Sequence, residues 1–489
     1  MPGETTPIHS DEERGRREEL ARIVRPVVVD DLPLAVSPEP DATLRGVEAN
    51  VDLFVMVGQV RGSDRRPSLG TRPLLAATCI LALLVADGSA TGLASTSQAK
   101  THKHPVASPH TSLAPSVATS AFGLDLMRAQ GPGNLVLSPD SVEAALAMTG
   151  TGAAGTTAVQ IARTLHLKGP SAFPAVGDLQ RAIVAGEAAA AVGDPEPPIL
   201  SIANGLFLQQ GFPVEQSFLS GLQEHFSTTP QSVDFRGDPT GSVEAVNTWV
   251  RNRTEGLIPQ LLLEPLPVET RLVLANAVYL KASWLYPFKH RETALAPFYN
   301  GRRNTPVEFM HETSYLRYGS GRGYQAVELP YRASTLSLLA VLPGKGKSLG
   351  ALLHHLGARE LARIVHGLSP SEVALSLPRF DLSTQVSLIE ALKSLGMTLP
   401  FSESADFSRI TATEALRIAV VEHAADFKVD EKGTVAAAAT AVGAEAVSGP
   451  PAPQVTFNAN RPFLFFLRDD RTGAVLFAGR LANPASTGT

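Results

Sequence analysis

Side chains that could act as nucleophiles or general bases occur in this chain, but the sequence assembles none of them into a catalytic constellation. His423 and several serines could supply a base and a nucleophile, yet a serine nucleophile also needs an orienting acid within hydrogen-bond distance of its base. The sequence places no acid beside them and contains no His-Glu-x-x-His pattern. We therefore expect no serine-hydrolase nucleophile elbow, assign no catalytic residue and predict that the protein is not an enzyme.

Two glycine-rich stretches partly match phosphate-binding loops. Residues 150–155, Gly-Thr-Gly-Ala-Ala-Gly, satisfy the dinucleotide-binding pattern, but they follow an alanine-rich helical run and lack a well-placed downstream acid. Residues 343–348 end as a phosphate loop does, but Val341 stands where the first glycine is required. We interpret the first stretch as a helix-ending turn and the second as a turn between elements, and predict no cofactor.

A third stretch, residues 431–448, carries a different kind of chemistry because its side chains are small. Four consecutive alanines favour a helix, whereas the flanking valines, threonines and glycines do not, and no amphipathic stripe runs through it. At a period of two, one face holds only small residues: Thr434, Ala436, Ala438, Thr440, Val442 and Ala444. The acidic Glu445 lies on the other face. The pattern predicts an exposed loop that could enter a sheet as a strand.

This stretch and its flanks resemble the serpins, which are serine protease inhibitors with a mobile reactive loop. Glu431-Lys-Gly-Thr, followed by small residues up to Thr440, resembles the hinge of inhibitory members, and residues 454–467 resemble the signature that follows the loop. Further matches follow in the family's order: Asn134 to Val142, Asn204 to Phe207, Asn247 to Val250, Asn276 to Trp284, Leu377 to Phe380, and His423 with the residues after it. Their joint order and spacing are specific.

Helical and strand-like patterns interleave without a βαβ rhythm, which predicts an α+β fold with antiparallel or mixed sheets. We expect helices at 115–126, 141–148, 156–165, 216–226, 242–255, 349–366 and 386–396. We expect strands at 199–208, 270–280, 324–329, 336–342, 372–377, 415–421, 464–466 and 474–479. The resemblance implies a serpin fold over residues 114–485, with three β-sheets, eight or nine helices and an exposed reactive-centre loop at 431–453.

The resemblance also implies roles for individual residues. It implies a hinge formed by Glu431, Gly433, Thr434, Ala436, Ala437, Ala438, Ala439 and Thr440. It implies a polar cluster beneath the central sheet, called the shutter, formed by Ser138, Ser141, Asn276 and His423. It implies a site where the loop enters the sheet, called the breach, with Trp284 and with Arg379 as an ion-pair partner of Glu431. The alternatives are a satisfied core histidine for His423 and a plain core aromatic for Trp284.

In the family, a target serine protease cleaves the loop, remains attached as a covalent acyl complex and is inactivated when the loop inserts. The resemblance places the reactive bond between Val447 and Ser448, with Ala446 or Ala444 as alternative cleavage points. Val447 would suit elastase-like or subtilisin-like proteases, whose specificity pockets take small aliphatic side chains. Two alternatives remain open: a non-inhibitory serpin acting as a binding protein, and a cross-class inhibitor of cysteine proteases.

Composition is consistent with a large buried core. The chain has 489 residues, 44% of them hydrophobic and 18% charged, and its net charge of -5 leaves no strongly basic footprint for nucleic acid. Cys79 is the single cysteine, which excludes an intramolecular disulfide framework and a cysteine-based zinc site. We predict a monomer without a metal site.

The N-terminal quarter of the sequence reads differently. Residues 1–72 form an extension that is either not translated or cytoplasmic, residues 73–94 a signal peptide or signal anchor with an apolar run at 73–86, and residues 95–113 a Ser/Thr/His/Pro linker. The run is shorter than the roughly 20 residues of a membrane span. If translation begins near Met56, the signal has an ordinary start and the protein is secreted. Otherwise an uncleaved segment would anchor it to the outer face of the cytoplasmic membrane.

Overall fold

The computed structural model describes residues 113–256, 258–301, 304–434 and 455–485. Within these residues the chain folds into nine α-helices and two hydrogen-bonded sheets, which confirms the predicted α+β class. Residues 1–112 and 435–454 lie outside them, and with them the predicted extension, signal segment, linker and most of the reactive loop. No helix in the described part of the chain is long and apolar enough to cross a membrane.

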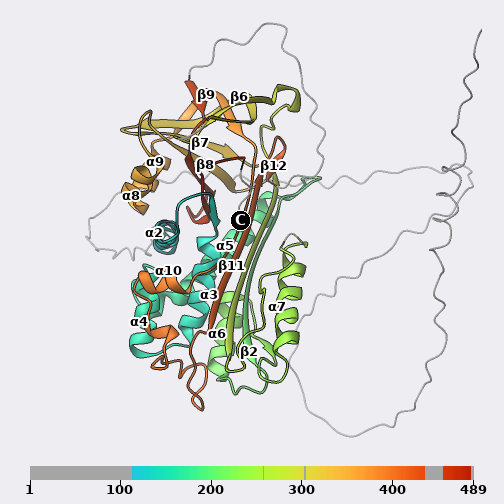
Figure 1. Cartoon of the computed structure of the whole chain (residues 1–489), viewed down its shortest axis with the longest axis vertical. Coiled ribbons are helices and arrows are strands. Elements are labelled where there is room, and N and C mark those ends of the chain that lie inside the picture. The colour runs from blue at the N-terminus through green and yellow to red at the C-terminus, as the bar shows by residue number, and fades with distance from the viewer. Residues whose placement is uncertain (1–112, 257, 302–303, 435–454, 486–489) are drawn as a thin grey trace, which may run out of the picture. The chain divides into compact units, whose positions relative to one another are not determined.

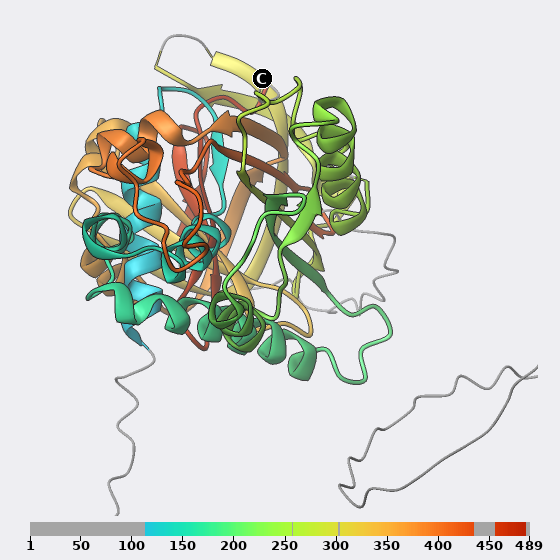
Figure 2. The same cartoon turned by 90° about the horizontal axis from the view of Figure 1, so that it is seen from below.

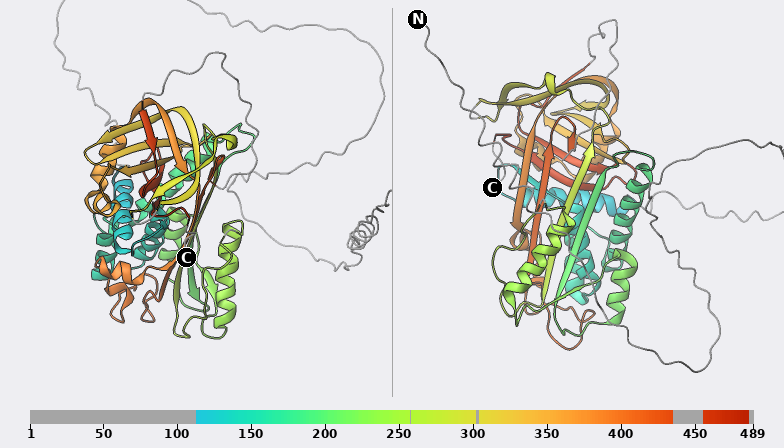
Figure 3. Two further views of the ribbon diagram at one scale, coloured as in Figure 1. Left: turned by 45° about the horizontal axis from the view of Figure 1, so that its top comes forward. Right: turned by 90° about the vertical axis from the view of Figure 1, so that its right-hand side faces the viewer.

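The first sheet has six strands and includes the start of the predicted reactive loop. Its strand order is β10 (Phe380–Ser387), β11 (Val420–Val429), β12 (Gly433–Thr434), β4 (Leu272–Ser283), β2 (Ile199–Gln209) and β3 (Gln231–Val233). β11 and β4 also pair directly with each other, in parallel, along part of their length. The right-hand view of Figure 3 shows the long strands of this sheet side by side.

The second sheet has nine strands. Eight of them follow the order β1 (Leu135–Leu137), β15 (Val475–Leu481), β14 (Phe463–Asp469), β8 (Leu336–Pro343), β7 (Tyr324–Pro330), β6 (Asn304–Gly321), β9 (Ser369–Pro378) and β13 (Val455–Asn458), and β5 (Ala294–Tyr299) pairs with β6. β6 pairs with β5 near its start and with β7 only near its end. The expected second and third sheets are therefore joined through one long strand.

Nine helices are described. They are α2 (Leu113–Ala129), α3 (Pro139–Thr151), α4 (Gly155–Thr164), α5 (Phe173–Ala190), α6 (Gln216–Phe226), α7 (Pro239–Arg253), α8 (Leu349–His355), α9 (Ala358–His366) and α10 (Ile389–Ser394). Short 3-10 helices occur at Pro170–Ala172, His290–Glu292 and Leu399–Phe401. In Figure 1, α7 lies on one side of the six-stranded sheet and α3, α5 and α6 lie on the other, and Figure 2 shows the same separation from below.

The alternation of side chains along β4 explains why helices cover both faces of this sheet. Leu272 and Leu274 belong to the apolar cluster that includes α3, whereas Val273 and Ala275 belong to the cluster that includes α7. Successive side chains of a strand point to opposite faces, so a strand buried on both sides is a continuous apolar run. α3 starts where Ser138 caps it and Pro139 occupies its first turn.

The structure corrects several predicted elements. α5, β5, β6 and β10 were not predicted, and the predicted helix at 349–366 is two helices separated at Leu356 and Gly357. The strand predicted at 415–421 begins only at Val420 and continues to Val429. The helix predicted at 386–396 is shorter at its start, because β10 continues to Ser387.

Candidate functional site

The first residues of the predicted loop already lie in the six-stranded sheet. β12 pairs antiparallel with β11 through Thr434 and Val429, and antiparallel with β4 through Gly433 with Ser283 and Thr434 with Ala282. Glu431, Gly433 and Thr434 are buried. The expectation of a wholly exposed loop is therefore wrong at its base, because β12 lies between the ends of β11 and β4.

A tight turn connects β11 to β12. The Asp430 carboxylate accepts hydrogen bonds from the backbone N–H of Lys432 (2.9 Å) and of Gly433 (3.3 Å). The Asp430 N–H in turn donates to the Gly433 carbonyl (3.0 Å). A Cβ atom on Gly433 would collide with the backbone carbonyl oxygen of Ala282. Glycine is needed here because two backbones approach closely, not because of its φ angle.

Glu431 anchors the base of the loop. Its carboxylate lies near Thr293 Oγ1 (2.7 Å), His290 Nδ1 (3.1 Å) and Arg379 Nε (3.5 Å). Burial alone would raise the pKa of Glu431, but the hydrogen bonds from Thr293 and His290 and the charge of Arg379 outweigh it and lower this pKa. The predicted pair with Arg379 is present, but the Glu431 side chain is only 8% exposed, so this is not the exposed pair that was expected.

Trp284 directly follows β4 and contacts the turn between β11 and β12. Its indole N–H donates to the Asp430 carbonyl (2.9 Å), and its backbone N–H donates to that of Lys432 (2.8 Å). Its ring stacks on Tyr331, with 4.4 Å between ring centroids. The Tyr331 hydroxyl lies 2.6 Å from Thr434 Oγ1. The motif matches did not single out Tyr331, because it follows an ordinary strand and its partner is 103 residues away in the chain.

The predicted shutter residues gather where α3 begins against β11. The Ser138 N–H donates to His423 Nε2 (3.1 Å), and Ser138 Oγ accepts from the Ser141 N–H (3.3 Å). Because Nε2 accepts, the proton of the neutral ring is on Nδ1. Nδ1 is buried and has no hydrogen-bond partner in the described part of the chain. Burial lowers the pKa of His423 to about 4, so the ring is neutral near pH 7.

A polar chain that sequence reasoning missed extends from the shutter to α5. Ser141 Oγ donates to Asn204 Oδ1 (2.8 Å), Asn204 Nδ2 donates to Gln180 Oε1 (3.0 Å), and Gln180 Nε2 donates to Asp140 Oδ2 (2.7 Å). Asp140 is buried, which raises its pKa to about 6. The chain links α3, β2 and α5 beneath the sheet.

Asn276 lies between the two strands that flank it, since its backbone pairs in register with His423 of β11 and Asn204 of β2. Its side chain is outside what the structure describes. So are Ala436, Ala437, Ala438, Ala439 and Thr440 of the predicted hinge, and the predicted reactive bond between Val447 and Ser448.

Comparison with known proteins agrees with this architecture. The family model for serpins, serine protease inhibitors, matches residues 117–484. The leukocyte elastase inhibitor of Bos taurus is 34% identical to this chain over 76% of its length and 99% of the inhibitor's length. An uncharacterized serpin-like protein of Thermococcus kodakarensis is 35% identical, over 75% of this chain and 85% of that protein. The chain belongs to the serpin family.

The fold of this serpin is shared with solved members of the family. The native-state crystal structure of tengpin, a thermophilic serpin, matches it with a TM-score of 0.67 and 26% identity, over 75% of this chain and 93% of tengpin. Serpins are a family of protease inhibitors and, as a class, not enzymes.

The serpin's glycine-rich stretches are structural. Residues 150–155 contain the C-terminus of α3, capped by Gly152, and the start of α4, which confirms a helix-ending turn. Residues 343–348 form a turn after β8, with a hydrogen bond from the Lys347 N–H to the Gly344 carbonyl. Residues 346–350 spell Gly-x-Ser-x-Gly, the sequence pattern of a nucleophile elbow, although no elbow was expected. Ser348 there caps the short α8 by accepting from the Ala351 N–H, as no nucleophile elbow does.

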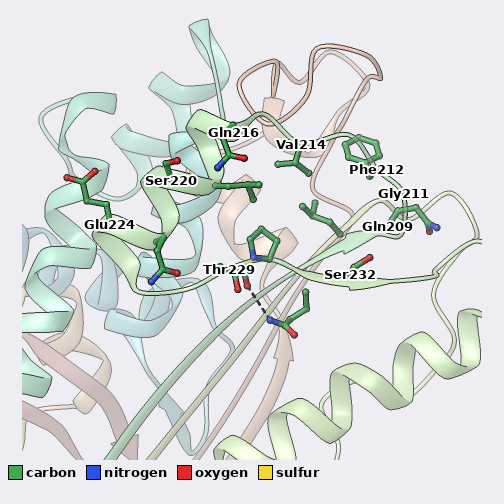
Figure 4. Close-up of a pocket in the computed structure, with 14 residues that line it drawn as sticks. Gln209, Gly211, Phe212, Val214, Gln216, Ser220, Glu224, Thr229 and Ser232 are labelled. Carbon is green, nitrogen blue, oxygen red and sulfur yellow. Dashed lines mark hydrogen bonds between the residues drawn. The ribbon is translucent and has the colours of Figure 1, made fainter. Parts of the chain in front are cut away.

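A surface groove of about 870 Å³ lies beside α6, with the edge strand β3 on its other side. Figure 4 shows its lining, which includes Phe212, Val214, Gln216 and Ser232. None of the predicted hinge, shutter or breach residues that the structure describes lines this groove. The groove is therefore separate from the site where the loop enters the sheet.

Proposed function

We propose that this serpin inhibits serine proteases as a single-use suicide substrate. The protease cleaves the loop between Val447 and Ser448, and the loop then inserts between β4 and β11. The observation that carries the proposal is the position of β12, which enters the sheet antiparallel to both neighbouring strands. A strand that has begun to insert at one end gives the rest of the loop a defined path.

The existing pairings support this path through their register. Thr434 pairs with Ala282 and with Val429. Counting nine residues onward along the loop, and nine back along each antiparallel strand, brings Gly443 opposite Val273 and Val420 (282 - 9 and 429 - 9). Val273 and Val420 are themselves paired directly in the closed part of the sheet. The two registers therefore agree, and the new strand would replace the direct β4–β11 pairing without a shift.

The same register would turn only small side chains toward the core, which supports insertion of this strand. Thr434 faces the core, so Ala436, Ala438, Thr440 and Val442 would face it too, and each is small. Thr440 would come opposite Asn276 and His423, six residues on from the Ala282 and Val429 pairings. The one later hydroxyl on this face would thus meet the buried Nδ1–H of His423, which has no partner in the closed sheet of the described residues.

Inhibition requires that insertion outrun deacylation. The attacking serine of the protease forms an acyl bond to the Val447 carbonyl and releases the Ser448 amine as the new N-terminus of the C-terminal fragment. Insertion would then pull the attached protease with the loop and distort its active site. Acyl hydrolysis needs atoms placed within a fraction of an ångström, so distortion leaves the acyl bond in place.

Val447 supports an elastase-like or subtilisin-like target, whose specificity pocket takes a small aliphatic side chain. The name of one relative, the leukocyte elastase inhibitor of Bos taurus, describes the same class of target for that protein. We further propose that this serpin is a secreted monomer that forms its covalent complex outside the cell. N-terminal sequencing of the secreted protein, expected to begin after the signal segment, tests the secretion proposal.

The decisive experiment mixes the purified serpin with pancreatic elastase. We expect an SDS-resistant complex and a released C-terminal peptide that begins at Ser448 by mass spectrometry. Val447→Arg should transfer complex formation to trypsin, which the parent should inhibit poorly. Cleavage without a complex for elastase, subtilisin and trypsin alike would favour a non-inhibitory binding protein, and a peptide beginning near Thr440 would show that the bond is wrongly assigned.

A further inference from the structure

The base of the loop is held in the sheet by a specific hydroxyl pair. We propose that Tyr331 is a positioning residue: its hydroxyl holds Thr434 between β4 and β11, and so sets the proportion of molecules whose loop has already begun to insert. The inference about the loop base stands on the described residues alone. Its consequence for inhibition rests on the proposed function.

The pair is closed off from water. Tyr331 OH and Thr434 Oγ1 are 2.6 Å apart, and the two residues are 3% and 1% exposed. Either hydroxyl can donate to the other. Because neither side chain reaches solvent in this arrangement, each depends on its partner to satisfy a buried polar group.

Tyr331 is fixed independently of the loop. Its backbone N–H donates to the Leu336 carbonyl (3.1 Å), and it forms an isolated β-bridge with Trp284. The next residue, Arg332, donates its N–H to the Ser283 carbonyl (2.8 Å), and its guanidinium lies 3.2 Å from an Asp194 carboxylate oxygen. Tyr331 is therefore held against the end of β4, next to the β4 residues that pair with β12.

The fluorescence of Trp284 can report whether the loop base is in the sheet. Its ring is stacked on Tyr331 and its indole N–H is bonded to the Asp430 carbonyl, so it contacts both the fixed residue and the turn that would move. It is 2% exposed. If β12 left the sheet, Trp284 would lose the hydrogen bonds to the turn and gain contact with water. Its fluorescence emission would then shift to longer wavelength.

The physical chemistry of a buried pair gives a distinctive signature. Removing one hydroxyl leaves the other buried and unsatisfied, whereas replacing both by apolar groups of similar shape is close to neutral. Departure of β12 from the sheet relieves the unsatisfied group, because water then reaches the Thr434 hydroxyl in Tyr331→Phe and the Tyr331 hydroxyl in Thr434→Val. We expect each single substitution to lower the ratio of inserted to expelled loop base about tenfold, and the double substitution to restore most of it.

The experiment uses a single-tryptophan background. The chain has two tryptophans, and Trp249 lies on α7 against Phe207, away from the turn. In Trp249→Phe protein, Tyr331→Phe and Thr434→Val should each shift Trp284 emission to longer wavelength, and Tyr331→Phe/Thr434→Val should return it towards the parent. Ser334→Ala, in the β7–β8 connection that also contains Tyr331, is the matched control, because it removes a hydroxyl that bonds Glu187 and the Leu336 N–H rather than the loop.

A second readout tests the consequence for inhibition. The number of serpin molecules consumed per elastase inactivated should rise several-fold in each single variant and fall again in the double variant, with cleavage itself unimpaired. Single variants without an emission shift, or a double variant perturbed as much as the sum of the singles, would overturn the assignment of Tyr331. If the parent forms no complex with any protease, the proposed function fails, but the fluorescence comparison still decides the role of Tyr331.

Discussion

The two ends of the boundary between β4 and β11 differ in a way that accounts for the proposed mechanism. At one end β12 separates the strands, through the pairings of Gly433 and Thr434. At the other end the strands pair with each other in parallel, from Val273 with Val420 to Val278 with Ala425. The same two strands therefore show an opened and a closed arrangement within one molecule.

The polar groups at the two ends are satisfied to different degrees. At the open end, the Thr434 hydroxyl, the Trp284 indole and the Asp430 carboxylate all have partners. At the closed end, His423 Nδ1 has none among the described residues. An unsatisfied buried donor costs about 1–3 kcal/mol. The closed end is therefore where an inserting strand would gain hydrogen bonds, and the open end shows the pairing that such a strand makes with β4 and β11.

The largest effect is expected from a charge at the open end. Thr434→Arg would bury a guanidinium opposite Tyr331 without an acidic partner, which costs several kcal/mol. We expect the loop base to leave the sheet and insertion to lose its race against deacylation. On gels with elastase, the variant should be cleaved and released as a substrate, with little or no stable complex.

Val435→Arg is the control for this prediction. A side chain one residue further along a strand points to the opposite face, so this arginine would remain in solvent on the way into the sheet. We expect its complex yield to stay close to that of the parent. Equal effects of the two substitutions would mean that the inserting strand does not have the two faces inferred for it.

An intermediate effect is expected when the pH is lowered, because His423 lies at the closed end of the boundary between β4 and β11. Burial lowers the pKa of His423 from an ordinary value of 6.5 to about 4. Since the folded value lies below the unfolded one, stability that is present above pH 6.5 is lost as the pH falls towards 4. The difference of about 2.5 pKa units corresponds to about 3 kcal/mol. Denaturant unfolding as a function of pH measures this loss.

His423→Gln isolates the histidine contribution, because glutamine can still accept from the Ser138 N–H. The pH profile of His423→Gln must be subtracted from that of the parent, because Asp140 and Asp470 also titrate in this range. Burial raises the pKa of each to about 6, so they add stability as the pH falls below that value. The parent should lose more stability than His423→Gln between pH 6.5 and 4. Parallel pH profiles would show that His423 is not buried as a neutral ring.

The smallest effect is expected from removing the Thr440 hydroxyl, which is proposed to contact His423 after insertion. Thr440→Val should leave the melting temperature of the intact serpin unchanged and lower that of the cleaved, inserted form, because it removes about one hydrogen bond of roughly 1 kcal/mol. Thr440→Ser keeps the hydroxyl and should match the parent. A loss confined to the intact form, or shared by Thr440→Ser, would contradict the register in which Thr440 faces His423.

Local patterns predicted helices whose faces differ in polarity, such as α6, and continuous apolar runs, such as β4. α6 was predicted with its observed bounds, and α3, β2 and β4 to within a few residues. α5 was missed because its alanine- and glycine-rich sequence carries little contrast between faces. β6 was missed because it pairs with three different strands along its length, so that buried and exposed positions do not alternate regularly.

The site was only partly predictable, because some of its residues are recognised only through distant partners. Glu431, Gly433, Thr434, Ser138 and His423 could be singled out because they lie in short motifs. Tyr331, Gln180 and Asp140 could not, because each becomes part of the site only through a partner that is distant in the sequence. Tyr331 meets Thr434 across 103 residues, and Gln180 meets Asp140 across 40.

The sequence by itself determined the small, uncharged face of the loop and the glycine and threonine at its base, because side-chain size and spacing set what a strand can bury. The tertiary structure alone decided that Gly433 and Thr434 are already in the sheet. That outcome depends on whether the ends of β4 and β11 leave room for a backbone, and on whether Tyr331 and Trp284 can satisfy what enters. These are properties of segments brought together by packing, and no local stretch of the chain encodes them.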